Sequence, residues 1–98
     1  MTSMTLLHRN QDALWTEFDG QVVVLSVTTG HYFETRGIGG VIWHLLASPH
    51  GTDDILRHVV ERYQVERAQA ERDVTAFLQS LRRAGLLVES SSAAALAR

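Results

Sequence analysis

The residues of this 98-residue chain that are best suited to chemistry are five histidines, at positions 8, 31, 44, 50 and 58. A metal site built on a helix usually needs two histidines three or four residues apart, and no pair has that spacing. Cysteine is absent, which excludes thiolate metal sites, disulfides and cysteine nucleophiles. We therefore expect scattered surface histidines, with no metal site and no cofactor.

Two further patterns have ordinary structural explanations. Asp53 and Asp54 form a carboxylate pair, but they stand at the expected start of a helix, where negative charge complements the helix dipole. Gly37–Gly40 follows a strand-like segment, yet it lacks the full dinucleotide-binding pattern and the strand–helix–strand unit around it. No serine stands in a nucleophile motif. The sequence thus predicts no catalytic residues and a protein that is not an enzyme.

Composition is that of a single globular domain. The chain is 45% hydrophobic and 20% charged, with a formal net charge of −2, and its nine basic residues, all arginine, form no basic block. No apolar run is long enough to cross a bilayer, and the N-terminus lacks the pattern of a signal peptide. We expect a cytoplasmic protein that binds neither membranes nor, as its main function, nucleic acid.

Strand signals fill the first half of the chain. Ala13–Phe18 and Gln21–Val27 are rich in aromatic and β-branched residues, and Asp19-Gly20 between them is typical of a type I′ hairpin turn. Thr28-Thr29-Gly30 then turns the chain into His31–Thr35. These segments predict an antiparallel meander of three strands.

Helical spacing of apolar residues follows in three segments, Gly37–Ser48, Thr52–Tyr63 and Glu66–Ala84. Thr52 is the expected N-cap of the second helix, and Gly85 ends the third. Strands followed by helices predict an α+β fold of the winged helix-turn-helix kind.

The two ends of the chain lack such patterns. We expect a flexible N-terminus over residues 1–11, a folded domain over residues 12–89 that closes with a short strand at Leu86–Glu89, and a disordered tail over residues 90–98.

The third strand has features of a docking edge. Tyr32 and Phe33 are adjacent, so they point to opposite faces of the sheet and only one can enter the core. In an open meander this strand lies at an edge. Charged residues and proline hinder an edge strand from pairing with another chain, and Glu34 is the only such residue here. An added peptide strand could pair there. A solvated edge without a partner is the alternative on these features alone.

The chain resembles the PqqD-like family, which comprises the leader-recognition elements of ribosomally synthesised and modified peptides. Three segments carry the resemblance over about residues 12–89: DGQVVVLSVTTGHYFETRGIGGVIWHLL, DDILRHVVERY and ERDVTAFLQSLRRAGLL. It implies a winged helix-turn-helix variant that binds the leader of a precursor peptide. The leader is added to the third strand, and its apolar side chains enter a groove against the third helix.

Carried over to this chain, the resemblance implies a peptide-binding strand at His31–Thr35 and contacts from the third helix. Helical geometry places the helix contacts beside the core stripe of Val74 and Leu78. The expected binding residues are His31, Tyr32, Phe33, Glu34, Thr35, Asp73, Ala76, Phe77, Ser80 and Ala84. Family members often have Leu-Asn before the first helix; Thr35-Arg36 stands here, and Thr35 is the expected cap instead.

The resemblance predicts a stand-alone protein that hands the leader to a separate maturation enzyme. A leader peptidase of a lasso-peptide pathway is the preferred partner, and a radical enzyme of quinone cofactor synthesis is another. A small winged-helix DNA-binding regulator is the alternative function, although the arginines of the helices are spread out rather than clustered. The open edge could also pair with that of a second copy to form a homodimer.

Overall fold

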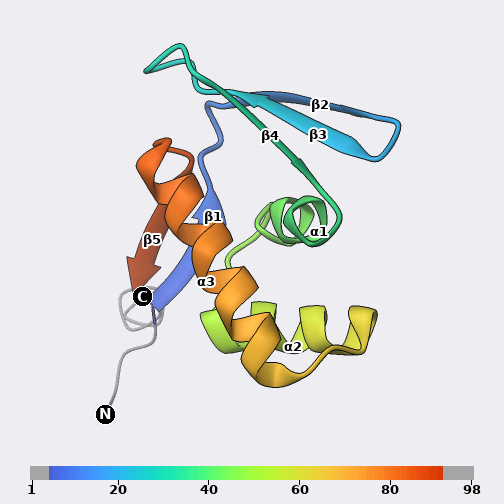
Figure 1. Cartoon of the computed structure of the whole chain (residues 1–98). Coiled ribbons are helices and arrows are strands. Elements are labelled where there is room, and N and C mark those ends of the chain that lie inside the picture. Colours follow the sequence, from blue (N-terminus) through green and yellow to red (C-terminus); the bar gives the residue numbers. More distant parts are fainter. Residues whose placement is uncertain (1–4, 92–98) are drawn as a thin grey trace.

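The computed structural model describes residues 5–91 and has an α+β fold (Figure 1), which confirms the predicted class. A three-stranded antiparallel sheet in the order β2-β3-β4 is followed by three helices, and β1 pairs with β5 in a separate two-stranded sheet. The elements are β1 Thr5–Arg9, β2 Leu14–Phe18, β3 Gln21–Leu25, β4 Tyr32–Arg36, α1 Ile38–Leu45, α2 Thr52–Tyr63, α3 Arg67–Arg83 and β5 Leu87–Ser91. None of these helices is both long and apolar enough to span a membrane.

The hairpin between β2 and β3 forms at the predicted turn. Asp19 and Gly20 both have positive φ, 57° and 76°, as a type I′ turn requires. The register places Val24 opposite both Trp15 and Phe33, so these three side chains share one face of the sheet. Alternation along the strands therefore decides which side chains meet the helices.

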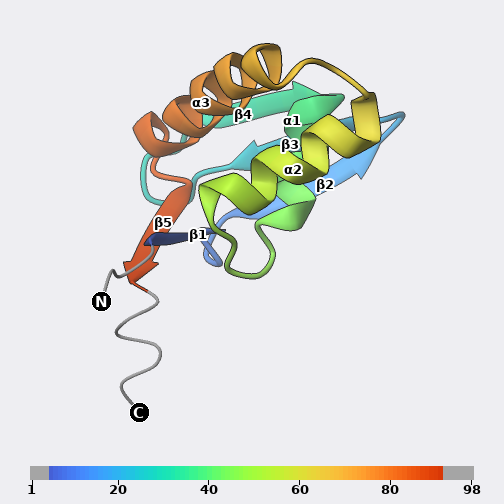
Figure 2. The same cartoon turned by 90° about the horizontal axis from the view of Figure 1, so that it is seen from below.

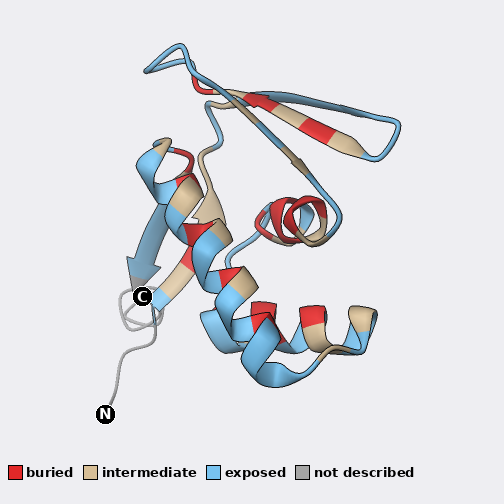
Figure 3. Ribbon diagram, viewed as in Figure 1, coloured by how far each residue is buried: buried red, intermediate tan, exposed pale blue. Residues whose placement is uncertain are grey.

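The core lies between the inner face of this sheet and the helices. Buried residues face inward from β3 and from all three helices, as Figure 3 shows. They are Leu7, Val22, Val24, Ile42, Trp43, Leu46, Ile55, Leu56, Val59, Ala70, Val74, Leu78, Leu81 and Leu86. The helical stripes predicted for α2 and α3 supply half of this core, because residues three and four apart share one side of a helix.

Two expected helix caps are wrong. Gly37, with φ 59°, precedes α1 as its N-cap, and no side chain caps this helix. The chain leaves β4 through this left-handed glycine, so Thr35 remains a strand residue rather than a cap. In α2 the N-cap is Gly51, and Thr52 is already the first helical residue.

The expectation of a loose N-terminus is wrong for Thr5–Arg9, which forms β1. This strand pairs with β5 in antiparallel register, with Leu7 opposite Glu89. The Leu7 side chain is buried, and its main chain exchanges hydrogen bonds of 2.8 and 2.9 Å with His50. At the other end, β5 extends through the first two residues of the expected tail, and residues 92–98 lie outside the described part. The folded unit is therefore wider than residues 12–89.

Arg9 fastens β1 to the rest of the fold. Its guanidinium lies 4.8 Å from the ring centroid of Trp15 and 5.0 Å from that of Trp43. It also donates a hydrogen bond of 3.1 Å to the Trp43 carbonyl. Burial lowers the pKa of this guanidinium from its ordinary value, but arginine stays protonated in proteins. Arg9 of β1 therefore makes cation–π contacts with a tryptophan of β2 and a tryptophan of α1.

Candidate functional site

The outer edge of β4 is unpaired among the residues that the structure describes, because β4 ends the sheet order. The Ser26 N–H donates to the His31 carbonyl at 2.9 Å, which makes these two residues a hydrogen-bonded pair. Hydrogen-bonded and non-hydrogen-bonded pairs alternate along an antiparallel ladder. The main-chain groups of Phe33 therefore point toward β3, whereas those of Tyr32 and Glu34 point to the free edge.

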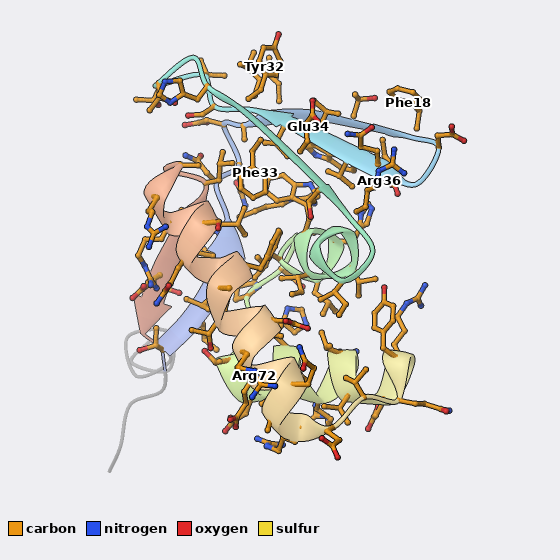
Figure 4. All side chains as sticks on the ribbon, in the orientation of Figure 1. Phe18, Tyr32, Phe33, Glu34, Arg36 and Arg72 are labelled. Atoms are coloured by element: carbon orange, nitrogen blue, oxygen red, sulfur yellow. The ribbon has the colours of Figure 1, made fainter. Side chains whose placement is uncertain are left out.

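The side chains of β4 divide between two faces. Phe33 and Thr35 are half-buried and face the helices, whereas Tyr32, 72% exposed, and Glu34 face outward. The Phe33 ring meets the ring of Phe77 from α3 edge-on, at 5.8 Å between centroids and 67° between planes. Figure 4 shows Phe33 on the side of α3 and Tyr32 on the opposite side of the sheet. Phe33, rather than Tyr32, is thus the aromatic residue that faces α3.

One stripe of α3 lies along this inner side of β4. Four half-buried residues follow each other at helical spacing next to the fully buried stripe that includes Val74 and Leu78, namely Asp73, Phe77, Ser80 and Ala84. Ala76, which was also expected to contribute, lies on the far flank of this stripe and is exposed. Figure 2 shows α3 running beside β4. We call the inner side of β4 and this stripe the β4–α3 face.

The polar groups that α3 contributes to the β4–α3 face have local partners. Both carboxylate oxygens of Asp73 accept hydrogen bonds of 3.1 Å from the Gln69 amide. The Ser80 hydroxyl donates to the Ala76 carbonyl at 3.1 Å. The face therefore has an apolar centre, Phe33 and Phe77, with one carboxylate on the same stripe.

Gly39 of α1 is a residue of this site that sequence reasoning did not identify. A Cβ at Gly39 would lie 1.9 Å from Thr35 Oγ1 and 2.8 Å from the Phe77 ring. The side chains of the β4–α3 face already fill that space. Only the absence of a Cβ lets α1 approach them this closely.

The outer face of the sheet is apolar as well. Leu25 of β3 stands opposite both Leu14 and Tyr32, and these side chains line a shallow hollow of about 230 Å³. Leu14 and Phe18 are more than 60% exposed. Exposed apolar side chains that are contiguous often mark an interaction surface. This face lies on the side of the sheet opposite the β4–α3 face.

Two solved structures are similar to this chain over most of its length. The chain is similar to a solved structure described as TbiB1 in complex with the TbiA(beta) leader peptide, with 31% identity and a TM-score of 0.74 over 82% of this chain and 93% of that one. It is also similar to lasso peptide synthetase B1 complexed with the leader peptide, with 26% identity and a TM-score of 0.71 over 84% of this chain and 96% of that one. No curated protein sequence matches the chain.

The sequence family comparison covers more than half of the chain. Residues 21–87 match the family of Coenzyme PQQ synthesis protein D (PqqD). The match extends from the first residue of β3 to the first residue of β5, so it includes β4 and α3. On this match and the two structural similarities, the chain belongs to the PqqD family.

Proposed function

We propose that this chain binds the leader segment of a ribosomally synthesised precursor peptide and presents it to a separate maturation enzyme. The observation that carries the proposal is the unpaired edge of β4, whose inner side chains face α3. Two similar solved structures contain a leader peptide, and one of them is of a lasso peptide synthetase. We assign the chain a binding role rather than a catalytic one, in a lasso-peptide or related pathway.

Strand addition at β4 is the proposed binding mode. Tyr32 and Glu34 each offer an N–H and a C=O at the free edge, so an extended peptide can continue the ladder. Each main-chain bond contributes about 0.5–1.5 kcal/mol net. Ordering a flexible leader removes several kcal/mol of that gain, so apolar contacts must supply the rest.

The β4–α3 face supplies those apolar contacts. We place alternate side chains of the leader against Phe33 and Phe77, with Ser80 and Ala84 farther along the same helical stripe. Asp73 can also accept a hydrogen bond from the leader, because the bonds from the Gln69 amide leave lone pairs on its carboxylate. Such contacts select apolar side chains at every second leader position, since successive residues of a strand point to opposite sides.

Three of the six arginines of α2 and α3 have carboxylate partners, which argues against the DNA-binding alternative. Arg57 pairs with Asp54, and Arg82 pairs with Glu89. Arg67 lies between two carboxylates, 3.6 Å from that of Glu71 and 3.8 Å from that of Asp53. Arginines that are paired in this way leave little positive potential for phosphates.

The outer face of the sheet is available for a second protein while a leader occupies the edge. Leu14, Phe18 and Tyr32 are exposed there, on the side opposite Phe33. We propose this face for the maturation enzyme, for which a leader peptidase is the first candidate. The free edge of β4 could also pair with that of a second copy, and leader binding would then compete with a homodimer.

The decisive experiment is a titration of isotope-labelled protein with candidate leader peptides encoded in small reading frames beside the gene. We expect saturable amide shifts in β4 and along Asp73–Ala84. Glu34→Pro should abolish binding without unfolding the chain, because the lost N–H points away from β3.

Glu17→Pro is the matched control at the opposite edge of the sheet. Phe18 and Gln21 close the two-residue turn as a hydrogen-bonded pair, so the Glu17 N–H also points away from β3. This variant should bind leader peptide like the unmodified chain. A folded Glu34→Pro protein with unchanged affinity would refute strand addition at β4.

A further inference from the structure

His50, Asp54 and His58 come together at the start of α2. One ligand atom from each residue lies within 4.8 Å of the ligand atoms of the other two. The rings of the two histidines meet edge-on, with centroids 6.2 Å apart. The expectation of scattered histidines is therefore wrong for this pair. The spacing of four residues places Asp54 and His58 on one side of α2, and His50, in the connection before the helix, reaches Asp54 from outside it.

His50 is oriented as a metal-ligating histidine is. Its Nδ1 lies 2.9 Å from the Ser48 carbonyl oxygen. A carbonyl can only accept, so Nδ1 carries the hydrogen and the lone pair of a neutral ring stands on Nε2. Nε2 faces Asp54 Oδ2 at 3.5 Å. Adjacent ligand atoms around tetrahedral zinc are roughly 3.3 Å apart, given bonds of about 2.0–2.1 Å.

Asp54 divides its two oxygens between two partners. Oδ1 accepts a hydrogen bond from Arg57, and Oδ2 is the oxygen that faces His50. Arg57 thereby holds the carboxylate in place, as partners outside the ligand set often do in metal sites. Its positive charge also opposes a bound cation, which limits affinity.

We propose that His50, Asp54 and His58 bind a divalent first-row transition-metal ion, for which zinc is the best match. Two imidazoles and one carboxylate are a common zinc donor set that leaves the fourth position open. His58 is exposed, so water or a ligand from another protein can take that position.

The bound ion would stabilise one corner of the fold. His50 lies in the connection before α2, and its main chain bonds to Leu7 of β1. Zinc would therefore tie this connection, and with it β1, to the helix that carries Asp54 and His58. None of the three ligands lies in β4 or α3, so metal binding can be tested without any leader peptide.

The test is a calorimetric titration of the tag-free, metal-stripped full chain with ZnCl₂, and with CoCl₂ followed by its visible absorption. We expect one equivalent to bind, with a rise in Tm. His58→Gln should weaken binding by at least about tenfold. It should leave stability in EDTA unchanged, since this side chain is exposed.

His44→Gln is the matched control. His44 is also exposed, and its Nε2 lies 2.8 Å from a carboxylate oxygen of Glu17, but residues 5–91 offer this pair no third ligand. The proposal predicts wild-type zinc affinity for this variant. It is overturned if the unmodified chain binds no zinc at millimolar concentration, or if His58→Gln binds as tightly as the unmodified chain.

Discussion

The ring of Phe33 in β4 meets the ring of Phe77 in α3 edge-on, with the two centroids 5.8 Å apart. This contact joins the edge strand of the sheet to the helix beside it. The same two rings form the apolar centre of the surface to which we assign leader binding. Stability and binding therefore share these side chains, and variants must be measured for both.

A double-mutant cycle on this pair should measure how much the edge-on contact itself stabilises the fold. Phe33→Ala and Phe77→Ala should each lower the free energy of unfolding by about 1–3 kcal/mol, because both rings are only half-buried. Their coupling should be about 0.5–1.5 kcal/mol. Urea unfolding measures these values. Additive effects in the double variant would show that the edge-on contact contributes no energy of its own.

Hydrogen exchange should report the free edge of β4 directly. The amides of Phe33 and Thr35 point toward β3 and should exchange slowly, whereas those of Tyr32 and Glu34 should exchange fast. Saturating leader peptide should slow the second pair. A homodimer through this edge would give a different result. The amides of Tyr32 and Glu34 would then exchange slowly without peptide, and their exchange would become faster when the protein is diluted.

Two neighbouring glycines of α1 should respond in opposite ways to alanine. Gly39→Ala should destabilise the fold by about 1–3 kcal/mol, because the new Cβ would collide with Thr35 and Phe77. Gly40→Ala should be neutral or stabilising by up to about 1 kcal/mol, since its Cβ would meet only Val22, at 3.7 Å. Thermal or urea unfolding of the two variants tests this difference. Equal stabilities would contradict the close approach at Gly39.

Arg9→Ala should destabilise the fold by about 2–3 kcal/mol, because it removes a charged hydrogen bond and two aromatic contacts. Arg9→Lys should recover part of this loss, since lysine keeps the charge but lacks the planar fork. Arg72→Ala, on the exposed side of α3, is the control and should change stability by less than about 0.5 kcal/mol. Urea unfolding of all three variants decides whether Arg9 fastens β1; an Arg9→Ala protein as stable as the control would show that it does not.

Local patterns in the sequence were sufficient for the β2–β3–β4 meander and the three helices. Asp19-Gly20 permits a turn that few other pairs allow, and apolar residues at helical spacing mark the buried side of each helix. The observed helix limits differ from the predicted ones by a few residues. The N-caps of α1 and α2 are glycines without side-chain hydrogen bonds, so cap chemistry could not locate these helix starts.

The sequence by itself determined that the chain folds as an α+β domain with an edge strand at β4, since both follow from short-range periodicity and turn chemistry. Only the tertiary structure decided that Thr5–Arg9 pairs with Leu87–Ser91, because Thr5–Arg9 has no distinctive strand pattern and the two segments lie at opposite ends of the chain. It also decided that Phe33 faces α3 and that His50 and His58 meet around Asp54. Both contacts depend on strand register and on the path into α2, which packing sets through long-range contacts.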